Sequence, residues 1–424
     1  MYTTPRVALS AGILVCIGSF GCGSVPRTMD YETFRQRTVE HEQRSLEQRE
    51  EFTRRFLFRM ERIHQENGLE SREPEVIIDV LLLSSGGQFG AFGVGVLEGW
   101  GAIESGPYQR PVFDIVTGVS TGALIAPFAL SGTDYSISRI ADLYKQADDT
   151  LAVLRGLLFF LPSRVSFFDN RSLVERIEQE IDRETIAEVA EAHRDHRMLL
   201  VGATDLDLGR FHIWDMGRLA ADAVESDDPS RFQKAMLSSA SIPAAFPPVE
   251  IDGVLYADGA AAVATFFGMD RHAIRQAVDA FMARNPGAPT PRFRMWMLIN
   301  GQLDAPPQLI EQRWISIASR SVAVLTKYST RTTLRQMQLA AELLEVEIGV
   351  PVEFRYLALP DNVELPESRS RLFDQDLMAK VHSIGYTLGN DPSSWRTEAI
   401  APDIPGSGFL LPEIRFDLDA LPQP

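Results

Sequence analysis

One short motif between two apolar runs constrains the fold of this chain more than any other feature. Gly118–Gly122 reads Gly-Val-Ser-Thr-Gly, with Val112–Val116 before it and Ala123–Ala126 after it. This order predicts a strand, a sharp turn and a helix, the setting in which the serine of a G-x-S-x-G motif is exposed as a nucleophile. The flanking glycines remove Cβ atoms where the backbone turns tightly. Ser120 would then lie at a helix N-terminus, where positive partial charge favours an oxyanion.

Two further turns accompany this motif. The glycine-rich turn Ser85–Gly90 follows the apolar run Val76–Leu83. The segment Tyr256–Ala260 contains an Asp-Gly turn, which closes a short apolar run. The first turn is no P-loop, since Gly-Lys-Ser/Thr does not follow, and it lacks the G-x-G-x-x-G pattern of dinucleotide sites. A tight strand–helix turn without chemistry is the alternative interpretation of these glycines.

Strands and helices are expected to alternate from Val76 onward. The expected strands are 76–83, 112–116, 198–203, 211–214, 254–256, 292–299 and 352–359. The expected helices are 90–97, 121–130, 173–181, 229–238 and 377–388, with one or two long helices within 306–347. Alternation of this kind predicts a mainly parallel sheet with helices on both faces. The last 30 or so residues are rich in proline and are expected to form an irregular wrap.

The N-terminus has the pattern of an export signal. Val7–Phe20 is apolar but short for a membrane span, and the small residue Gly21 precedes Cys22, as at a bacterial lipoprotein cleavage site. We expect lipidation at Cys22, and an uncleaved signal anchor is the alternative. Both interpretations predict an exported, membrane-tethered protein. As a lipoprotein it would lie in a bacterial cell envelope, with the outer membrane as one destination.

Four segments follow from these patterns. We expect a signal peptide at 1–22, a charged helical stalk at 23–74, a catalytic domain at 75–300 and a mostly helical extension packed on it at 301–424. The stalk is expected because Arg27–Glu73 is dense in Glu, Arg and Gln with apolar residues at loosely helical spacing.

Charge and composition narrow the partners. The formal net charge of −17 argues against nucleic acid. It also disfavours electrostatic docking to anionic membranes, so that membrane contact should be apolar or through a lipid anchor. The two cysteines, Cys16 and Cys22, both precede the body of the protein, which therefore offers no cysteine ligands, and the seven histidines are scattered. We expect no metal and no organic cofactor.

A serine nucleophile needs a base, and the sequence favours an aspartate over a histidine. No histidine after Ser120 lies in a glycine-rich turn that follows a strand, where a triad histidine is expected. Asp258 has the better context, because it follows an apolar strand, and sites in open α/β sheets form outside strand carboxyl ends. A Ser-His-Asp hydrolase that uses His272 or His382 remains the alternative.

Five segments in this order resemble the patatin-like phospholipase family. They are Ser84–Leu97, Thr117–Ala123, Ala203–Gly209, Ser239–Pro248 and Tyr256–Ala260, within a region of about Val76–Ile299. The resemblance implies a three-layer α/β/α fold and a lipid acyl hydrolase of phospholipase A or esterase type, with a lipid or phospholipid substrate.

The resemblance also assigns roles to individual residues. It implies Ser120 as the nucleophile and Asp258 as its base, without a histidine. It implies an oxyanion hole formed by the backbone N–H groups of Gly86, Gly87 and Gln88. The motif glycines that would support these groups are Gly90, Gly118, Gly122 and Gly259.

The chain departs from the family pattern at the glycine-rich turn. Ser85 replaces the first family glycine, and Phe89 replaces a residue that is often Arg or Lys. The second family glycine after Asp258 is Ala260, and 261–267 lacks the familiar asparagine. A weakly active or inactive patatin-fold protein that binds lipid or acts as a scaffold is therefore a second alternative. The apolar segment Leu151–Pro162 is expected as a lid or acyl-chain wall, or else as the end of a core helix.

Overall fold

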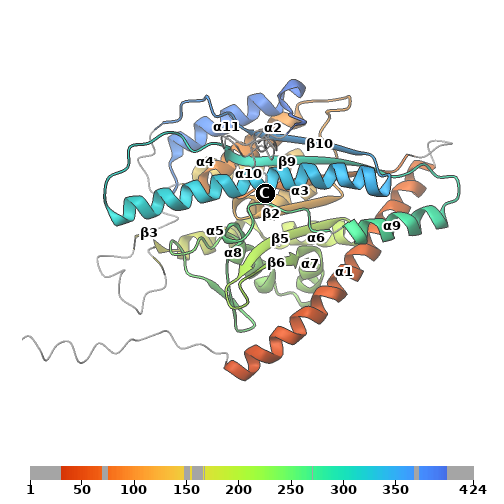
Figure 1. Cartoon of the computed structure of the whole chain (residues 1–424), viewed down its shortest axis with the longest axis horizontal. Helices are drawn as coiled ribbons and strands as arrows, with labels where there is room; N and C mark the ends of the chain where they lie inside the picture. The colour runs from red at the N-terminus through yellow and green to blue at the C-terminus, as the bar shows by residue number, and fades with distance from the viewer. Residues whose placement is uncertain are drawn as a thin grey trace, which may run out of the picture.

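The fold is built on one eight-stranded sheet (Figure 1). The structure is a computed structural model, and it describes residues 30–68, 75–147, 153–154, 166, 168–269, 271–366 and 372–398. The strand order is β10-β9-β1-β2-β5-β8-β7, and β6 also pairs with β5. The strands are β1 Ile77–Leu83, β2 Ile115–Val119, β5 Met198–Asp205, β6 Arg210–Asp215, β7 Val249–Ile251, β8 Val254–Asp258, β9 Arg292–Gln302 and β10 Val352–Leu359. A separate two-stranded sheet pairs β3 Val153–Leu154 with β4 Phe168–Asp169.

Five neighbouring strands, from β10 to β5, run parallel, whereas β6, β7 and β8 pair antiparallel. The central strands β2 and β5 are buried along their whole length. Such strands are covered on both faces, which explains their continuous apolar runs. The expected mainly parallel sheet is confirmed.

The strand expected at 112–116 lies three residues later, at Ile115–Val119. Val112 is exposed and follows a proline. Before the strand, the Asp114 carboxylate accepts hydrogen bonds from the backbone N–H of Asp79 at 2.8 Å and from the Arg59 guanidinium at 2.7 Å. The strand therefore leads directly into Ser120.

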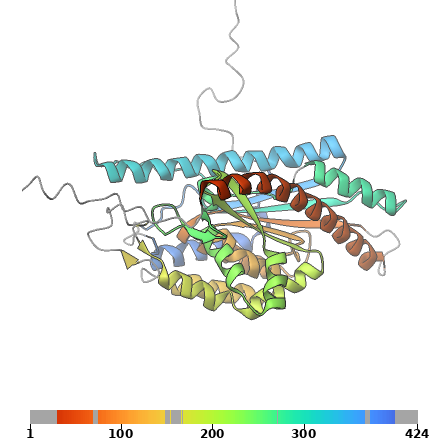
Figure 2. The same cartoon turned by 90° about the horizontal axis from the view of Figure 1, so that it is seen from below.

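Helices cover both faces of the sheet (Figure 2). One face carries α2, α3, α6, α7, α8 and α11, with α4 and α5 outside them, and the other carries α1, α9 and α10. The bounds are α1 Tyr31–Gly68, α2 Gly90–Gly101, α3 Thr121–Ser131, α4 Asp134–Gln146, α5 Arg171–Glu180, α6 Arg183–Arg194, α7 Met216–Ser226, α8 Ser230–Ala240, α9 Arg271–Arg284, α10 Trp314–Ile348 and α11 Gln375–Gly389. The expected three-layer α/β/α architecture is confirmed.

The sequence pattern did not single out four of these helices: α4, α6, α7 and α9. Their apolar residues are interleaved with charges, as in α6, whose first turn is set by the Asp182 carboxylate accepting from the backbone N–H of Thr185 at 2.9 Å. Such capped, amphipathic helices gain their stability mainly from packing on the sheet.

The charged stalk expected at 23–74 is, over its second half, part of the core. Helix α1 buries Phe52, Phe56 and Met60 against the sheet. Its buried Arg55 pairs with Asp215 at 2.9 Å, which fixes the helix to the end of β6. The prediction of a solvated stalk is therefore wrong for this half, because the apolar side of the helix packs on a face of the sheet.

The long helix expected within 306–347 is a single helix, α10, which connects the parallel strands β9 and β10 (Figure 1). It begins eight residues later than expected, after an irregular segment at 306–313. The boundary expected at residue 300 falls inside β9, and β10 belongs to the same sheet as the rest. No helix among the described residues is long and apolar enough to cross a membrane.

Candidate active site

Three turns meet at one edge of the sheet: the glycine-rich turn after β1, the turn between β2 and α3, and the Asp-Gly turn after β8. β1 and β2 are adjacent and parallel, so that Leu83 pairs with Gly118 and their carboxyl ends coincide. The third turn reaches the same place from an antiparallel strand, because Asp258 pairs with Ala203 of β5 and Gly202 pairs with Val119 of β2.

As expected, Asp258 lies at the carboxyl end of a strand, but that strand is antiparallel to its neighbours. β8 runs against β5, and β5 extends beyond β2, which leaves room for the Asp-Gly turn beside the end of β2. Gly259 lies there without a side chain, and a Cβ at this position would come within 2.5 Å of the Gly202 carbonyl oxygen. The tight contact brings the Asp258 carboxyl to the turn that bears Ser120.

Ser120 is held in a strained backbone conformation. Its φ is 57° and its ψ is −122°, which side-chain-bearing residues rarely adopt. Such strain persists only where the surroundings enforce it. Here the Ser120 N–H donates to the Ser239 hydroxyl at 2.9 Å, and the Ser239 hydroxyl donates to the Gly202 carbonyl at 2.6 Å. The Ser120 carbonyl accepts from the first turn of α3.

Asp258 is buried, and burial raises the pKa of its carboxyl to about 6. Hydrogen bonding by the Ser120 hydroxyl and by the backbone N–H of Ala260, at 2.8 Å, lowers the pKa in part. The backbone is fixed as well, since the Thr204 hydroxyl donates to the Asp258 carbonyl at 2.9 Å. A carboxylate whose pKa is near neutrality and which lies next to a serine hydroxyl is suited to take the proton of that hydroxyl.

The glycine-rich turn presents backbone donors to the same space. Gly87 has a φ of +56°, in the left-handed region that favours glycine, and it begins the short turn that leads into α2. Within the described chain, no hydrogen bond engages the backbone N–H groups of Gly87 and Gln88. N–H groups at a helix start carry positive partial charge, so that the turn can accommodate an oxyanion.

The four supporting glycines all lie where the turns approach one another. A Cβ on any of them would contact neighbouring atoms at under 3.0 Å, and these atoms belong to the turns, to the adjoining strands β1, β2 and β5, and to Tyr144. The closest approach is that of Gly90, where a Cβ would collide with the Thr121 hydroxyl, and a Cβ on Gly122 would meet the Leu83 carbonyl oxygen at 2.5 Å. The four are Gly90, Gly118, Gly122 and Gly259.

Asn300 holds the glycine-rich turn and was missed by the sequence analysis. From the end of β9 its side-chain amide donates to the Ser84 carbonyl at 2.7 Å, and its backbone N–H donates to the Ser84 hydroxyl at 2.8 Å. Gly86 lies so close that a Cβ would come within 2.1 Å of the Asn300 carbonyl oxygen. A polar residue that directly follows the apolar run Met295–Ile299 was the available signal.

The C-terminal part of the chain also contacts this turn. The Gln88 side-chain carbonyl accepts from the backbone N–H of Asp374, at the start of α11, at 2.8 Å. The Lys327 ammonium of α10 lies 5.8 Å from the centre of the Phe89 ring. A cation thus stands beside the position where the family often carries one, and Phe89 itself packs against the core. Burial lowers the pKa of Lys327.

Ser85 does not disrupt the turn. Its backbone N–H donates to the Ala264 carbonyl at 2.9 Å, and its carbonyl accepts from the Ser84 hydroxyl at 2.8 Å. The side chain at this position is accommodated in the buried layer beneath the turn, at 8% exposure.

An apolar cavity of about 70 Å³ extends from Ser120 between α3, α4, α5 and α8. Its walls are aliphatic and aromatic, and Gly87 and Ser120 line it together. The main wall residues are Leu124, Phe128, Leu143, Leu173, Ile177, Phe246 and Phe373. A second cavity of about 490 Å³ lies beside Trp214 and Tyr256, and Ser120 does not line it. The cavity at Ser120 suits the hydrocarbon part of a ligand.

The histidine alternatives find no support in the geometry. His382 is in α11 and lies 2.7 Å from the Glu98 carboxylate of α2, and His272 is exposed at the start of α9. Neither lines the cavity at Ser120. Across the ranges that the structure describes, no group of three His, Cys, Asp or Glu residues could hold a metal ion.

Several sequence predictions lie outside the described residues. They are the signal peptide at 1–22 with its lipidation site Cys22, most of the segment Leu151–Pro162, of which only β3 is described, and nearly all of the irregular wrap expected over the last 30 or so residues.

Comparison with known proteins gives one family match, in the central region. Residues 81–267 match the family model of patatin-like phospholipase. No curated protein matches the sequence. Among solved structures, the chain is similar to VipD from Legionella pneumophila, with 11% sequence identity, a TM-score of 0.34, and coverage of 77% of this chain and 68% of that chain.

Proposed function

We propose that this protein is a lipid acyl hydrolase that cleaves carboxylic esters through an acyl-Ser120 intermediate. One arrangement carries the proposal: a strained serine at the mouth of an apolar cavity, beside a buried aspartate whose carboxyl pKa is raised by burial to about 6. The match of residues 81–267 to the patatin-like phospholipase family supports the same reaction class.

In the proposed reaction, the Ser120 oxygen attacks the ester carbonyl carbon and its proton passes to the Asp258 carboxylate. The negative charge on the former carbonyl oxygen is stabilised by the N–H groups of Gly86, Gly87 and Gln88. The C–O bond to the alcohol breaks, and the alcohol oxygen takes the proton from Asp258. Water then attacks the acyl group with Asp258 as base, which releases the fatty acid and restores Ser120.

The substrate class follows from the cavity. Its walls offer hydrocarbon contact and few polar partners, so that an acyl chain is the part of the substrate we place there. We propose a phospholipid or a simpler lipid ester as substrate, with the head group outside this cavity.

The test is hydrolysis of a fluorogenic acyl ester and of phospholipid vesicles by the full chain. We expect Ser120→Ala and Asp258→Asn each to lower kcat by about 10⁴-fold or more. Asp252→Asn is the matched control, because Asp252 is an exposed carboxylate that pairs with Arg231 at 2.7 Å. His272→Ala and His382→Ala should retain activity, and loss in either would favour a histidine triad.

A fluorophosphonate probe separates an enzyme from a binding protein. We expect covalent labelling of wild type at Ser120 and none of Ser120→Ala. A folded wild type that hydrolyses no ester and resists the probe would overturn the proposal in favour of the lipid-binding or scaffold alternative.

We further propose that the protein is exported and tethered to a membrane through lipidation of Cys22, on the strength of the sequence pattern around it. In a bacterial host, metabolic labelling with a fatty acid should mark wild type and not Cys22→Ser. An unlabelled wild type that stays membrane-bound would indicate the signal anchor instead.

A further inference from the structure

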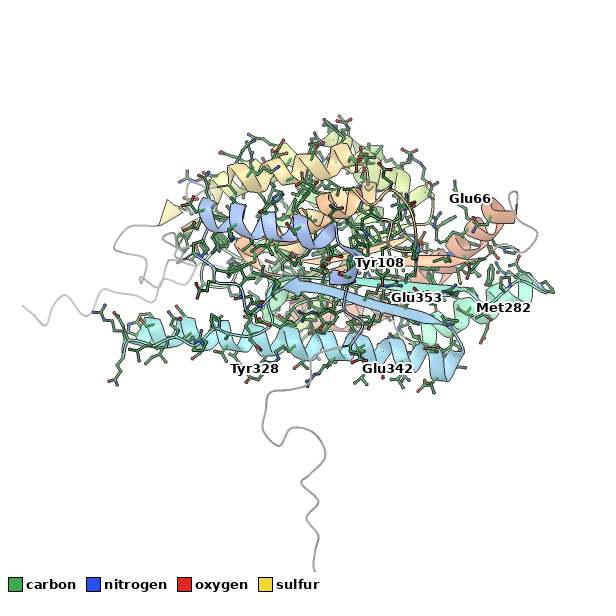
Figure 3. All side chains as sticks on the ribbon, turned by 90° about the horizontal axis from the view of Figure 1, so that it is seen from above. Glu66, Tyr108, Met282, Tyr328, Glu342 and Glu353 are labelled. Atoms are coloured by element: carbon green, nitrogen blue, oxygen red, sulfur yellow. The ribbon has the colours of Figure 1, made fainter. Side chains whose placement is uncertain are left out.

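The apolar cavity that begins at Ser120 has a defined depth. Along α3 it is lined by Ser120, Leu124 and Phe128, which lie four residues apart on one side of the helix. Eight residues, at a rise of about 1.5 Å each, place Phe128 about 12 Å along α3 from Ser120. The cavity lies on the face of the sheet opposite α10, the helix on which Figure 3 labels Tyr328 and Glu342.

Helix α4 runs beside α3 from one end of the cavity to the other. Next to Ser120, the hydroxyl groups of Tyr144 and Thr121 are hydrogen-bonded to each other. Five residues earlier in α4, the Arg139 guanidinium lies 5.7 Å from the centre of the Phe128 ring. The contacts of α4 therefore place Ser120 and Phe128 at opposite ends, as α3 does.

The end of the cavity at Phe128 is closed. The Phe128 side chain is 2% exposed, and so is Ile181, which lines the cavity from the end of α5. Behind the Phe128 ring, Arg139 donates to the Glu180 carbonyl and to the Asp182 carboxylate, both at 3.0 Å. A ligand that extends past Phe128 would have to displace the ring and break these bonds.

The side of the cavity between α4 and α5 carries polar groups. Arg176 of α5 donates to the side-chain carbonyl of Gln146, the last residue of α4, at 2.9 Å. Arg176 also pairs with Glu180 at 3.5 Å, and both of these residues line the cavity. A hydrocarbon chain could leave the cavity here only past charged groups, and contact with hydrocarbon disfavours such groups. The chain is therefore directed toward Phe128.

Volume and depth limit the length of an acyl chain in this cavity. A group the size of a water molecule takes up about 10–15 Å³ of cavity volume, so about 70 Å³ has room for about five to seven methylene groups. An extended chain advances about 3.5 Å for every three bonds, so that a depth of about 12 Å holds about ten bonds at most. An acyl chain of a bilayer lipid is longer, because each leaflet is about 15 Å of hydrocarbon.

We propose that Phe128 limits the acyl chain that Ser120 accepts to about eight carbons, so that the substrates are esters of medium-chain fatty acids. The ring lies where the end of such a chain would arrive, and Arg139 holds the ring in place. This inference rests on the proposed acyl-Ser120 chemistry and names the acyl part of the substrate.

A series of fluorogenic esters that differ only in acyl length measures the limit in the full chain. The acyl groups run from about four to about 16 carbons, in the same detergent throughout. Each buried methylene should raise kcat/KM by about threefold to fourfold, so we expect a rise up to about eight carbons and a fall beyond it. A maximum at the longest chains would overturn the proposal.

Phe128→Ala should move the maximum to longer chains. A phenyl ring occupies about the volume of three or four methylene groups, so we expect a shift of about three or four carbons. Phe281→Ala is the matched control, because Phe281 is an equally buried phenylalanine of α9, on the other face of the sheet, and should leave the maximum in place. Equal shifts in the two variants would show general loosening of the core and overturn the role of Phe128.

Leu124→Phe tests the limit in the opposite direction and does not depend on the folding of Phe128→Ala. Leu124 lines the cavity halfway between Ser120 and Phe128. A larger side chain there should move the maximum to about four carbons. An unchanged maximum in the folded variant would show that the acyl chain does not run along α3, and the proposal would fail.

The Ser120→Ala chain separates this inference from the proposed function. The probes are uncharged alkyl methyl ketones of the same lengths, and calorimetric titration measures their binding without catalysis. We expect the affinity to rise by about threefold to fourfold per methylene up to about eight carbons and to fall beyond. A length limit in binding, with no hydrolysis of any ester by wild type, would overturn the function and leave the inference. Hydrolysis by wild type without a length limit would do the reverse.

Discussion

The turn that carries Ser120 and the turn that carries Gly87 lie at the same edge of the sheet but are held in different ways. The Ser120 turn is fixed by Ser239 and Gly202, from α8 and the adjacent strand β5. The Gly87 turn is tied to Asn300 and Asp374, 216 and 286 residues along the chain from their partners Ser84 and Gln88.

The difference separates two kinds of dependence. The sequence of the Ser120 turn predicts the turn by itself, and the residues that hold it, Ser239 and Gly202, lie within the matched region 81–267. The proposed oxyanion turn is completed by residues outside that region. The C-terminal part of the chain therefore contacts the candidate active site, through Asn300, Lys327 and Asp374.

Among the residues that support the two turns, Asn300 has the largest expected effect. Asn300→Ala removes the donor to the Ser84 carbonyl, so that the glycine-rich turn loses its register and kcat should fall by about 10²–10³-fold with little change in KM. Steady-state kinetics on a soluble ester measures it, with thermal unfolding as the check on folding. Asn285→Ala is the control, since its amide bonds only the Phe281 carbonyl at the end of α9. An unchanged kcat would show that the turn holds itself.

The pH dependence should belong to the Ser120 side alone. Asp258 must be ionised to accept a proton, so kcat/KM should fall below pH 6 by about tenfold per pH unit and level off above it. Asn300→Ala should lower the plateau without moving the midpoint. A midpoint near pH 4 would indicate that the Asp258 carboxyl is solvated.

Stability should change with pH in the opposite sense. The pKa of Asp258 is raised on folding, from 3.8 to about 6, so its protonated form favours the folded state. That contribution is fully present below pH 3.8 and is lost as the pH rises through 6, at a cost of about 3 kcal/mol. Asp258→Asn should therefore be more stable than wild type at pH 8, by up to this amount, in urea unfolding. Equal stabilities would contradict the raised pKa.

Ser239→Ala should have a smaller effect on the nucleophile turn. It removes the acceptor for the Ser120 N–H and the donor to Gly202, and a lost hydrogen bond of this kind costs about 1–2 kcal/mol. We expect kcat to fall by about fivefold to tenfold. Ser238→Ala is the neighbouring control, because the Ser238 hydroxyl serves Trp214 and Ala235 instead. Equal losses in both variants would indicate general damage to α8.

Gln88→Ala should have the smallest effect. It removes the acceptor for the Asp374 N–H but keeps the backbone N–H that the oxyanion uses, so we expect kcat to fall by about threefold. Gln276→Ala, an exposed amide beside His272, is the control. A loss as large as that of Asn300→Ala would make α11 an equal support of the turn.

By itself, the sequence determined the α/β class, the three turns and the residues they carry. Those features depend on short-range chemistry: apolar runs, glycine at tight turns, and a serine or aspartate at a strand end. Ser120 and Asp258 each lie in a turn that the sequence predicted, and the pairing of β8 with β5 brings the two turns together.

Only the tertiary structure decided the strand direction of β8, the burial of α1 and the supports of the glycine-rich turn. The pairing of β8 with β5 depends on the path of the intervening chain, residues 206–253. The apolar pattern of a strand does not specify whether the strand pairs parallel or antiparallel. Likewise, nothing near Ser84 in sequence specifies Asn300, because a side chain 216 residues away becomes a partner only when β9 is placed beside β1.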